Sequence, residues 1–483
     1  MQNVQVLVDG ESTLVFAFET DGQVLELGDG RLVIDIAVSE TASSGGFGSV
    51  IQTNPAALGT FSLRNTLEAA LQNAGRLVSA DSAYHAIVDS YATAADGRDP
   101  AASHCDDQSA EVGGPGLNGF PLQCGRLESL QFDNLDAWFP IAAVNRLDLA
   151  PADGSSCGQQ RLIFANGEPI GNARMLLIVE AQIDNPNPAC GVDACRPIAE
   201  LWTSVAGEPD PFVRAGMLQD AFLGAGIGSG FGPFIHADRL GPNGGQIRTN
   251  NFNDAPWTLR EFHFEPGPFG IPRPRPVGDS PNGALWDDTA PAAAGAPCRS
   301  AFLSALDGLL TDNLSTMSFV VPEPCKDAES RNDFSQDYAF HLQQGSGAFQ
   351  GQLAAELVGT GLSPEDIAAR ARFAGSCMGC HQESSGTFLG NGVSAPFQFD
   401  FVHVNERITV PCDDGSGGCF AISEALRDEF LPHRRRVVSD VLASSGGCAS
   451  EGGVPLAASA LTPLSGSGPV KTLGGQIAAP HAH

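Results

Sequence analysis

Apolar and polar residues alternate through the first 38 positions of the chain, and Asp-Gly pairs interrupt the alternation three times. A period of two residues is typical of strands that bury one face, and Asp-Gly is a common hairpin turn. We therefore expect a β-rich N-terminal module over residues 1–60. Its candidate strands lie at residues 4–8, 14–18, 24–27 and 32–36.

Helical and strand periods both occur between residues 61 and 265, which predicts a mixed α/β domain over this range. Ser62 is placed to cap a helix whose apolar face begins at Leu63. Further helices are expected at residues 83–93, 197–206 and 212–223, and strands at residues 161–164, 175–180, 246–250 and 257–265.

A run rich in proline and glycine begins at residue 266 and predicts a connector over residues 266–298. The apolar periodicity that follows is helical, so residues 299–445 are expected to form a mainly helical domain. Residues 446–483 are rich in Gly, Ala, Ser and Pro, which predicts a flexible tail. The expected fold class is α+β with several domains, in which a β-containing N-terminal and central part precedes the helical domain.

The chain carries 26 basic and 56 acidic residues, a formal net charge of −30 over 483 residues. A chain this acidic is not expected to bind nucleic acid or an anionic membrane. No apolar run reaches the roughly 18 residues that a transmembrane helix needs. The first residues lack the basic and apolar segments of a signal peptide, so we expect Met1 to be a trimmed or partial start.

Twelve cysteines are many for a cytosolic protein, and several lie in loops rich in Gly, Pro and Asp. Two belong to the motif described next, and the other ten form an even set that predicts up to five disulfides in an oxidising compartment. Cys190–Cys195 and Cys412–Cys419 are the pairs that the spacing favours. Cys157 lies in residues 154–158, which match the G-x-S-x-G pattern of a hydrolase nucleophile elbow. The strand–turn–helix setting of such an elbow is not predicted here, so Cys157 is interpreted as a disulfide partner. Scattered free thiols are the alternative.

Residues 377–381 read Cys-Met-Gly-Cys-His. Cys-x-x-Cys-His is the attachment signature of a c-type haem, since two thiols can bond the two vinyl groups of the porphyrin and the adjacent imidazole can bind iron. Random placement of 12 Cys and 10 His gives about 0.006 such motifs per chain, so the spacing is informative. The alternatives are a redox Cys-x-x-Cys or half of a zinc site, although the chain has no second Cys-x-x-Cys.

At these five residues, and in the helical pattern before them, the chain resembles the c-type cytochromes. The resemblance implies one covalent haem c bound through Cys377 and Cys380, with His381 as the proximal iron ligand, so the helical domain would be a haem c domain. A helix capped by Ser363 and ending at Gly375 is expected to deliver the two thiols. No motif assigns the rest of the chain to a family.

The second axial ligand is the point at which the chain departs from the small cytochromes. Those proteins usually supply a methionine downstream of the motif, and no methionine follows Met378. His403 is the first candidate, because in a strand it shares a face with three phenylalanines, Phe397, Phe399 and Phe401. A histidine hydrogen-bonded in the core is the plainer interpretation of His403. Other candidates are His433, His341, His481, His483 and Met317.

Three arginines follow His433, namely Arg434, Arg435 and Arg436. Haem propionates need cationic partners, and the planar guanidinium group suits a carboxylate, so these arginines are candidate cofactor contacts. The plainer interpretation is a solvated basic helix start.

Three functions remain open from the sequence. The first is electron transfer by a secreted or periplasmic monohaem protein, with a redox partner protein or a small-molecule electron donor or acceptor as its partner. The second is a haem peroxidase or oxidase with an open distal side, where His403, His433 or Glu383 acts as acid or base. The third is a structural or assembly-forming protein that carries haem. An oligomer is compatible with each.

Overall fold

The structure is a computed structural model that describes residues 5–9, 13–17, 47–92, 104–105, 116–123, 134–167, 174–228, 230–242, 244–251, 256–278, 280–290, 295–380, 384–398, 403–412 and 414–444. Its contacts divide the chain into two compact units, Met1–Thr41 and Ala42–His483. The site residues expected from the sequence belong to the second unit.

The first unit contains a hairpin of β1 (Gln5–Asp9) and β2 (Thr13–Ala17), in which Val6 lies opposite Phe16. The alternating pattern therefore predicted these two strands correctly. The strands expected at residues 24–27 and 32–36 lie outside the described residues.

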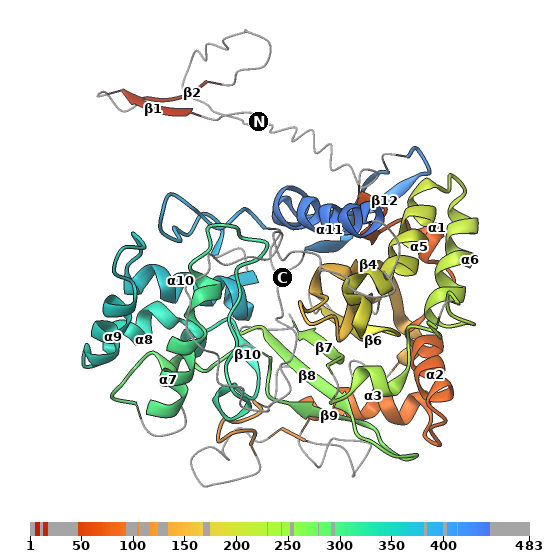
Figure 1. The fold of residues 1–483 in the computed structure, drawn as a ribbon, viewed down its shortest axis with the longest axis horizontal. Helices are drawn as coiled ribbons and strands as arrows, with labels where there is room; N and C mark the ends of the chain where they lie inside the picture. Colours follow the sequence, from red (N-terminus) through yellow and green to blue (C-terminus); the bar gives the residue numbers. More distant parts are fainter. Residues whose placement is uncertain are drawn as a thin grey trace. The chain divides into compact units, whose positions relative to one another are not determined.

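An antiparallel sheet, eight-stranded among the described residues, organises the second unit (Figure 1). Strands β4 to β8 are neighbours in the chain and in the sheet, and β3 pairs with β4 at one edge. At the other edge, β9 and β10 pair with different halves of β8. The strands are β3 (Ile51–Gln52), β4 (Trp138–Arg146), β5 (Ser156–Asn166), β6 (Met175–Asp184), β7 (Gln246–Asn251), β8 (Thr258–Phe264), β9 (Pro272–Arg275) and β10 (Ser330–Arg331).

This sheet joins parts of the chain that the sequence pattern assigned to different domains. Ile51 of β3 pairs with Val144 of β4, so the residues just before position 60 belong to the second unit and not to an N-terminal module. The proline-rich segment, expected as a connector, supplies β9. Its prolines fit because an edge strand needs ladder hydrogen bonds on one side only. The α+β class is confirmed, but the expected boundaries at residues 265 and 298 do not separate the sheet.

One face of the sheet is covered by helices from the first half of this unit (Figure 1). Trp138 of β4 donates to the Tyr84 hydroxyl of α3 at 2.8 Å, and Trp202 of α5 donates to Gln160 of β5 at 2.7 Å. The helices are α1 (Pro55–Leu58), α2 (Leu63–Asn73), α3 (Ala80–Val88), α5 (Arg196–Gly207) and α6 (Pro211–Phe222). The cap of α2 at Ser62 is the one expected, and α3 starts three residues earlier than expected.

The C-terminal elements are α7 (Ala296–Ser304), α8 (Tyr338–Gln344), α9 (Ala348–Glu356), α10 (Pro364–Gly375), β11 (Val404–Pro411), β12 (Gly418–Ile422) and α11 (Leu431–Ala443). Parts of them, including the end of α10 and Arg434 of α11, face the other side of the sheet. A 3-10 turn, Cys377–Cys380, follows α10, and a π-helical turn, Ala425–Phe430, leads into α11. Trp286 stacks on Tyr338 and contacts Phe302, and these aromatic rings join the α7–α8 region to the main hydrophobic core.

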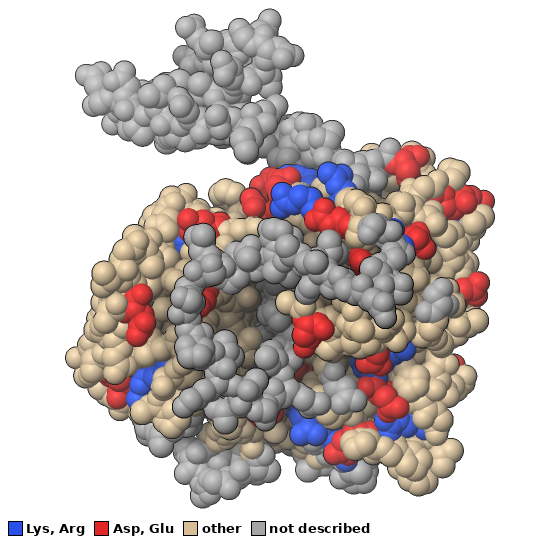
Figure 2. Space-filling model, viewed as in Figure 1, with Lys and Arg blue, Asp and Glu red and all other residues tan. Residues whose placement is uncertain are grey.

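Acidic and basic side chains are intermingled on the face of the molecule drawn in Figure 2, without a large area of one sign. Within the described part of the chain, none of the helices combines the length and apolar character needed to cross a bilayer.

Three disulfides lie among the described residues: Cys157–Cys195, Cys298–Cys325 and Cys412–Cys419. Cys105 and Cys190 are disulfide-bonded as well. The Cys412–Cys419 prediction is confirmed, and so is the disulfide role of Cys157. The Cys190–Cys195 prediction is wrong: the fold brings the start of β5 against the start of α5, a contact that spacing along the chain does not reveal.

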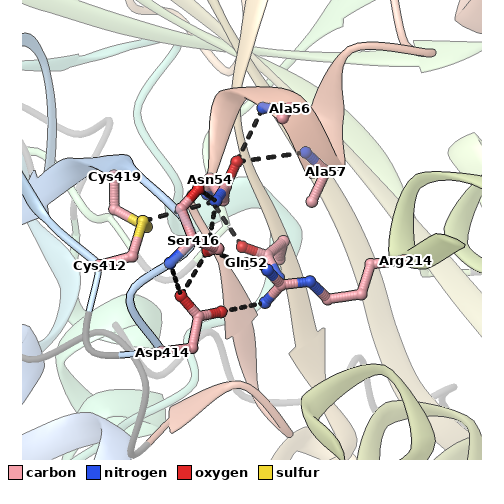
Figure 3. The surroundings of a disulfide bond; sticks show 9 residues. All are labelled: Gln52, Asn54, Ala56, Ala57, Arg214, Cys412, Asp414, Ser416 and Cys419. Carbon is pink, nitrogen blue, oxygen red and sulfur yellow. Dashed lines mark hydrogen bonds and ion pairs between the residues drawn. A yellow bond between two sulfur atoms is a disulfide. The ribbon is translucent and has the colours of Figure 1, made fainter. Parts of the chain in front are cut away.

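The Cys412–Cys419 bridge closes the β11–β12 hairpin against the start of α1 (Figure 3). Asn54 donates to the Ser416 hydroxyl at 2.8 Å and to the Cys412 sulfur at 3.5 Å, and it caps α1 by accepting from Ala56. Arg214 of α6 pairs with Asp414 at 2.6 Å. The hairpin is thus fixed to the helical side of the unit, which holds the segment before β11 in place.

Candidate functional site

A pocket lies between the second face of the central sheet and the C-terminal elements. Its cavity volume is about 190 Å³. This volume is below the roughly 300–1,000 Å³ of typical ligand pockets, and the pocket is open to solvent at its mouth. The sheet contributes apolar side chains (Ile163, Leu176, Ile178, Leu259) and charged ones (Arg146, Arg161, Glu180, Arg248).

The end of α10 brings the first cysteine of the motif to this pocket. Ser363 and Asp366 form a capping box at the start of α10, as the sequence predicted for its cap, and the helix ends at Gly375. Cys377 follows, lines the pocket and is half-buried. Its backbone N–H donates to the Ser330 hydroxyl of β10 at 2.8 Å. The motif segment is therefore attached to the edge of the central sheet.

Gly379, inside the motif, is required by packing. A Cβ atom added there would lie 2.1 Å from the carbonyl oxygen of Arg372, which is backbone and cannot move aside easily. The turn also depends on Ser376, whose hydroxyl accepts from the Gly379 N–H at 3.1 Å and donates to the same carbonyl at 2.8 Å. The side chain of Cys380 and all of His381 lie outside the described residues.

His403 lines the same pocket, just before β11. Its Nδ1 atom lies 2.9 Å from the Ser423 hydroxyl, and its ring meets Phe430 edge-on with centroids 5.7 Å apart. A hydrogen bond at Nδ1 fixes the ring and directs Nε2 towards a ligand, which is the usual arrangement for a metal-binding histidine. The chain thus presents an oriented imidazole to the pocket.

The sequence pattern selected His403 because a strand would place it beside three phenylalanines, and the structure corrects this reason. The residue lies in a bend that precedes β11, not within a strand with alternating phenylalanines. Phe397 is 66% exposed, and Phe399 and Phe401 lie outside the described residues. The aromatic contact of the imidazole is Phe430, which the sequence pattern did not pair with it.

The other candidate ligands that the structure describes do not line the pocket. His433 is buried on α11, where burial lowers its pKa, and it does not line the pocket. The Nε2 atom of His341 lies 2.9 Å from the carbonyl oxygen of Phe334. Met317 is a buried core residue. His481 and His483 lie outside the described residues.

The three consecutive arginines of α11 point in different directions. Arg434 is buried, lines the pocket and lies 3.9 Å from Asp148. Arg435 is exposed and extends over the ring of Phe47, with 5.3 Å to its centroid, and Arg436 is also exposed. Of the expected propionate contacts, the fold brings Arg434 to the pocket and leaves Arg435 and Arg436 outside it.

Charged residues on the sheet were missed by the sequence interpretation. Arg146, Arg161, Glu180 and Arg248 line the pocket. Arg146 and Glu180 lie in strands that are otherwise largely apolar, β4 and β6, whereas β5 and β7 contain several other polar residues. A charged residue inside an apolar strand is costly to bury without a partner, and that was the available signal. Register is needed to see that Arg161 lies opposite Glu180, and the sequence does not supply it.

Protein-family models, curated proteins and solved structures all yield no match to this chain. The interpretation of the pocket therefore depends on the residues and geometry described above.

Proposed function

We propose that this chain is a c-type haem protein that holds one covalent haem in the pocket beside Cys377 and transfers electrons. One observation carries the proposal: Cys377, His403 and Arg434 line a single pocket. The sequence had marked these residues for three separate haem contacts, a thiol, an axial ligand and a propionate partner. They lie far apart in the chain, so their convergence supports a common ligand.

The residues present fit the proposed group. A haem has an apolar face, two carboxylates and an iron that takes axial ligands. The pocket offers apolar side chains from β5, β6 and β8, guanidinium groups, a half-buried cysteine and an oriented imidazole. When bound, the group would supply a one-electron couple, while the chain holds it, orients His403 through Ser423 and excludes water with the apolar wall.

The proposal assigns Cys377 and Cys380 to the thioether bonds and His381 to the proximal position, as the resemblance to c-type cytochromes implies. His403 is proposed as the second ligand, because its ring is fixed at the pocket. Two imidazole ligands give iron a lower potential than one imidazole and one thioether, since thioether ligation raises the potential.

A haem enzyme of peroxidase or oxidase type is a second candidate. The charged sheet wall of the pocket favours it, because Arg161, Glu180 and Arg248 could contact a polar substrate there. In that case His403 would act as an acid or base and not as a ligand. The spin state of the resting iron separates the two candidates.

The disulfides among the described residues are compatible with an extracellular or periplasmic location. We place the protein there, with a redox partner protein or a small-molecule electron donor or acceptor as its partner. Because the formal charge is −30, a basic partner protein would be attracted to it at low ionic strength.

The test is maturation of the full chain in a host that attaches haem c. The mass of the purified protein should increase by one haem, and the haem should stay with the protein in acidified organic solvent. The double variant Cys377→Ala/Cys380→Ala should lose it. Cys412→Ala/Cys419→Ala removes two other cysteines and should keep it. Extractable haem in the unmodified protein would contradict the proposal.

A further inference from the structure

The pocket face of the sheet carries a row of ionic groups formed by the strand register. Arg161 of β5 lies opposite Glu180 of β6, with their closest side-chain atoms 3.3 Å apart. Arg248 of β7 lies 3.8 Å from Glu180 and 3.4 Å from Glu261. Arg146 and Arg434 flank this row and both pair with Asp148.

These guanidinium groups are largely removed from water. The side chains of Arg161 and Arg248 are 12% and 14% exposed, and those of Arg146 and Arg434 are 1% and 6% exposed. Burial, the largest cause, lowers the pKa of Arg161 to about 9, and although Glu180 opposes the shift, Arg146 and Arg248 add to it. Burial and repulsion from Arg146 lower the pKa of Arg434 as well. Burial thus disfavours the charged form of both guanidinium groups, and a carboxylate ligand would offset that cost.

The charged row borders directly on apolar surface. Ile163 of β5 pairs with Ile178 of β6, two residues along each strand from Arg161 and Glu180. Leu176 and Leu259 extend this apolar surface of the pocket. A ligand that fits both parts has an apolar body and a negatively charged end. Carboxylate matches the fork of a guanidinium group, and the pair is strong where water is excluded.

We propose that Arg161 and Arg248 form a carboxylate-binding site in the wall of the pocket. The carboxylate can come from the propionates of the bound haem or from a free, partly apolar carboxylic acid. The first source depends on the proposed function and the second does not. Glu180 and Glu261 hold the two arginines in position. The other titratable groups described around the row are Asp148, His263, Arg146, Arg434, His403 and Cys377.

The experiment compares the full matured protein with Arg161→Gln and Arg248→Gln. Arg436→Gln, exposed on the same helix as Arg434 but outside the pocket, is the matched control. Adipate is the probe for a free acid, titrated by calorimetry. The reduction potential, followed from pH 5 to pH 8, is the probe for the propionates.

If the propionates fill the site, adipate does not bind the matured protein. The potential of Arg161→Gln then gains a pH dependence, because a propionate that loses its guanidinium partner takes up a proton more readily. Arg161→Lys should restore the flat profile. If a free acid fills the site, adipate binds the unmodified protein and its affinity falls tenfold or more in Arg161→Gln and Arg248→Gln.

The inference is overturned if the variants match the control in both measurements, or if adipate binds them as it binds the unmodified protein. If the chain carries no haem after maturation, the proposed function is wrong, but the carboxylate-binding inference is not yet contradicted. The adipate titration of the haem-free chain then still decides whether the arginines bind carboxylate.

Discussion

The imidazole of His403 is held by the hydroxyl of Ser423, with 2.9 Å between Nδ1 and Oγ, while the Ser423 N–H donates to the backbone carbonyl of His403 at 2.8 Å. Two hydrogen bonds between the same residues fix both the backbone and the ring. A histidine held in this way can serve as an iron ligand without much loss of side-chain freedom on binding.

Replacing His403 with Ala should convert low-spin iron to high-spin iron, because one axial ligand is lost. Optical and paramagnetic spectra of the matured protein measure this change. His433→Ala is the matched control and should leave the spectrum unchanged, since His433 does not line the pocket. A resting protein that is already high-spin would favour the enzyme candidate.

Ser423→Ala should keep the iron low-spin but weaken the hold on His403. Loss of a hydrogen bond to a ligating histidine typically costs about 10- to 100-fold in metal affinity or activity. Added imidazole should therefore displace His403 more easily in this variant, by about the same factor. Equal imidazole affinities in the variant and the unmodified protein would show that Ser423 does not position the ligand.

Asp327 should make the protein less stable as the pH rises from 4 to 6. Burial is the main cause that raises the pKa of this carboxyl to about 6, although Arg331 and Asn282 oppose the shift. A raised pKa in the folded state means that its stabilising contribution is complete below pH 4 and is lost as the pH rises through 6. The loss from this group is at most about 3 kcal/mol.

Denaturant unfolding at several pH values measures this slope, and Asp327→Asn should remove most of it between pH 4 and 6. Glu329, whose pKa burial also raises, contributes in the same direction, so some slope will remain. Asp288→Asn is the control: hydrogen bonds from Ser346 lower the pKa of Asp288 to about 2, so this variant should change the pH dependence of stability only below pH 4, where the stabilising contribution of the carboxylate is lost as the pH falls. An unchanged slope in Asp327→Asn would show that its carboxyl titrates normally.

Asn54→Ala should lower the free energy of unfolding by about 2–4 kcal/mol, because one side chain has two roles. It caps α1, and it donates to Ser416 beside the Cys412–Cys419 bridge (Figure 3). Asn54→Ser keeps a capping hydroxyl but cannot reach Ser416, so it should lose only part of this energy. Similar stabilities of the two variants would mean that the cap contributes little of the lost free energy of unfolding.

Removal of Cys157–Cys195 should cost more stability than removal of Cys412–Cys419. The first bridge closes a loop of 38 residues and the second a loop of 7. Loop-closure entropy gives about 3.9 and 2.4 kcal/mol for these lengths, so the double-alanine variants should differ by about 1.5 kcal/mol in the free energy of unfolding. The reverse order would indicate that native contacts of the hairpin, not entropy, determine the cost.

Local signals predicted local structure well. The helix before the motif was predictable because Ser363, Pro364 and the acidic residues of its first turn act within a few positions of one another. The motif itself is likewise contiguous. His403 lines the pocket, but it lies in a bend before β11, and Phe399 and Phe401 of the pattern used to select it lie outside the described residues.

Features that depend on distant pairing could not be predicted. The carboxylate site needs the register of β5 and β6, which determines that Arg161 meets Glu180. The Cys157–Cys195 bridge needs the docking of α5 on the sheet. The β9 strand contains two prolines, a composition that favours a connector until an edge position on β8 is known.

The pairing of β10 with β8 has a consequence for dissecting this protein. The hydroxyl of Ser330 accepts a hydrogen bond from the backbone N–H of Cys377. Ser330 also belongs to β10, which pairs with the half of β8 that β9 leaves unpaired. A fragment truncated before residue 299 would lose β10 and leave that half of β8 unpaired, which invites aggregation. A fragment starting there would lack the sheet against which the motif is fixed. The segment proposed to attach haem and the completion of the sheet thus both depend on β10, so the chain should be studied whole.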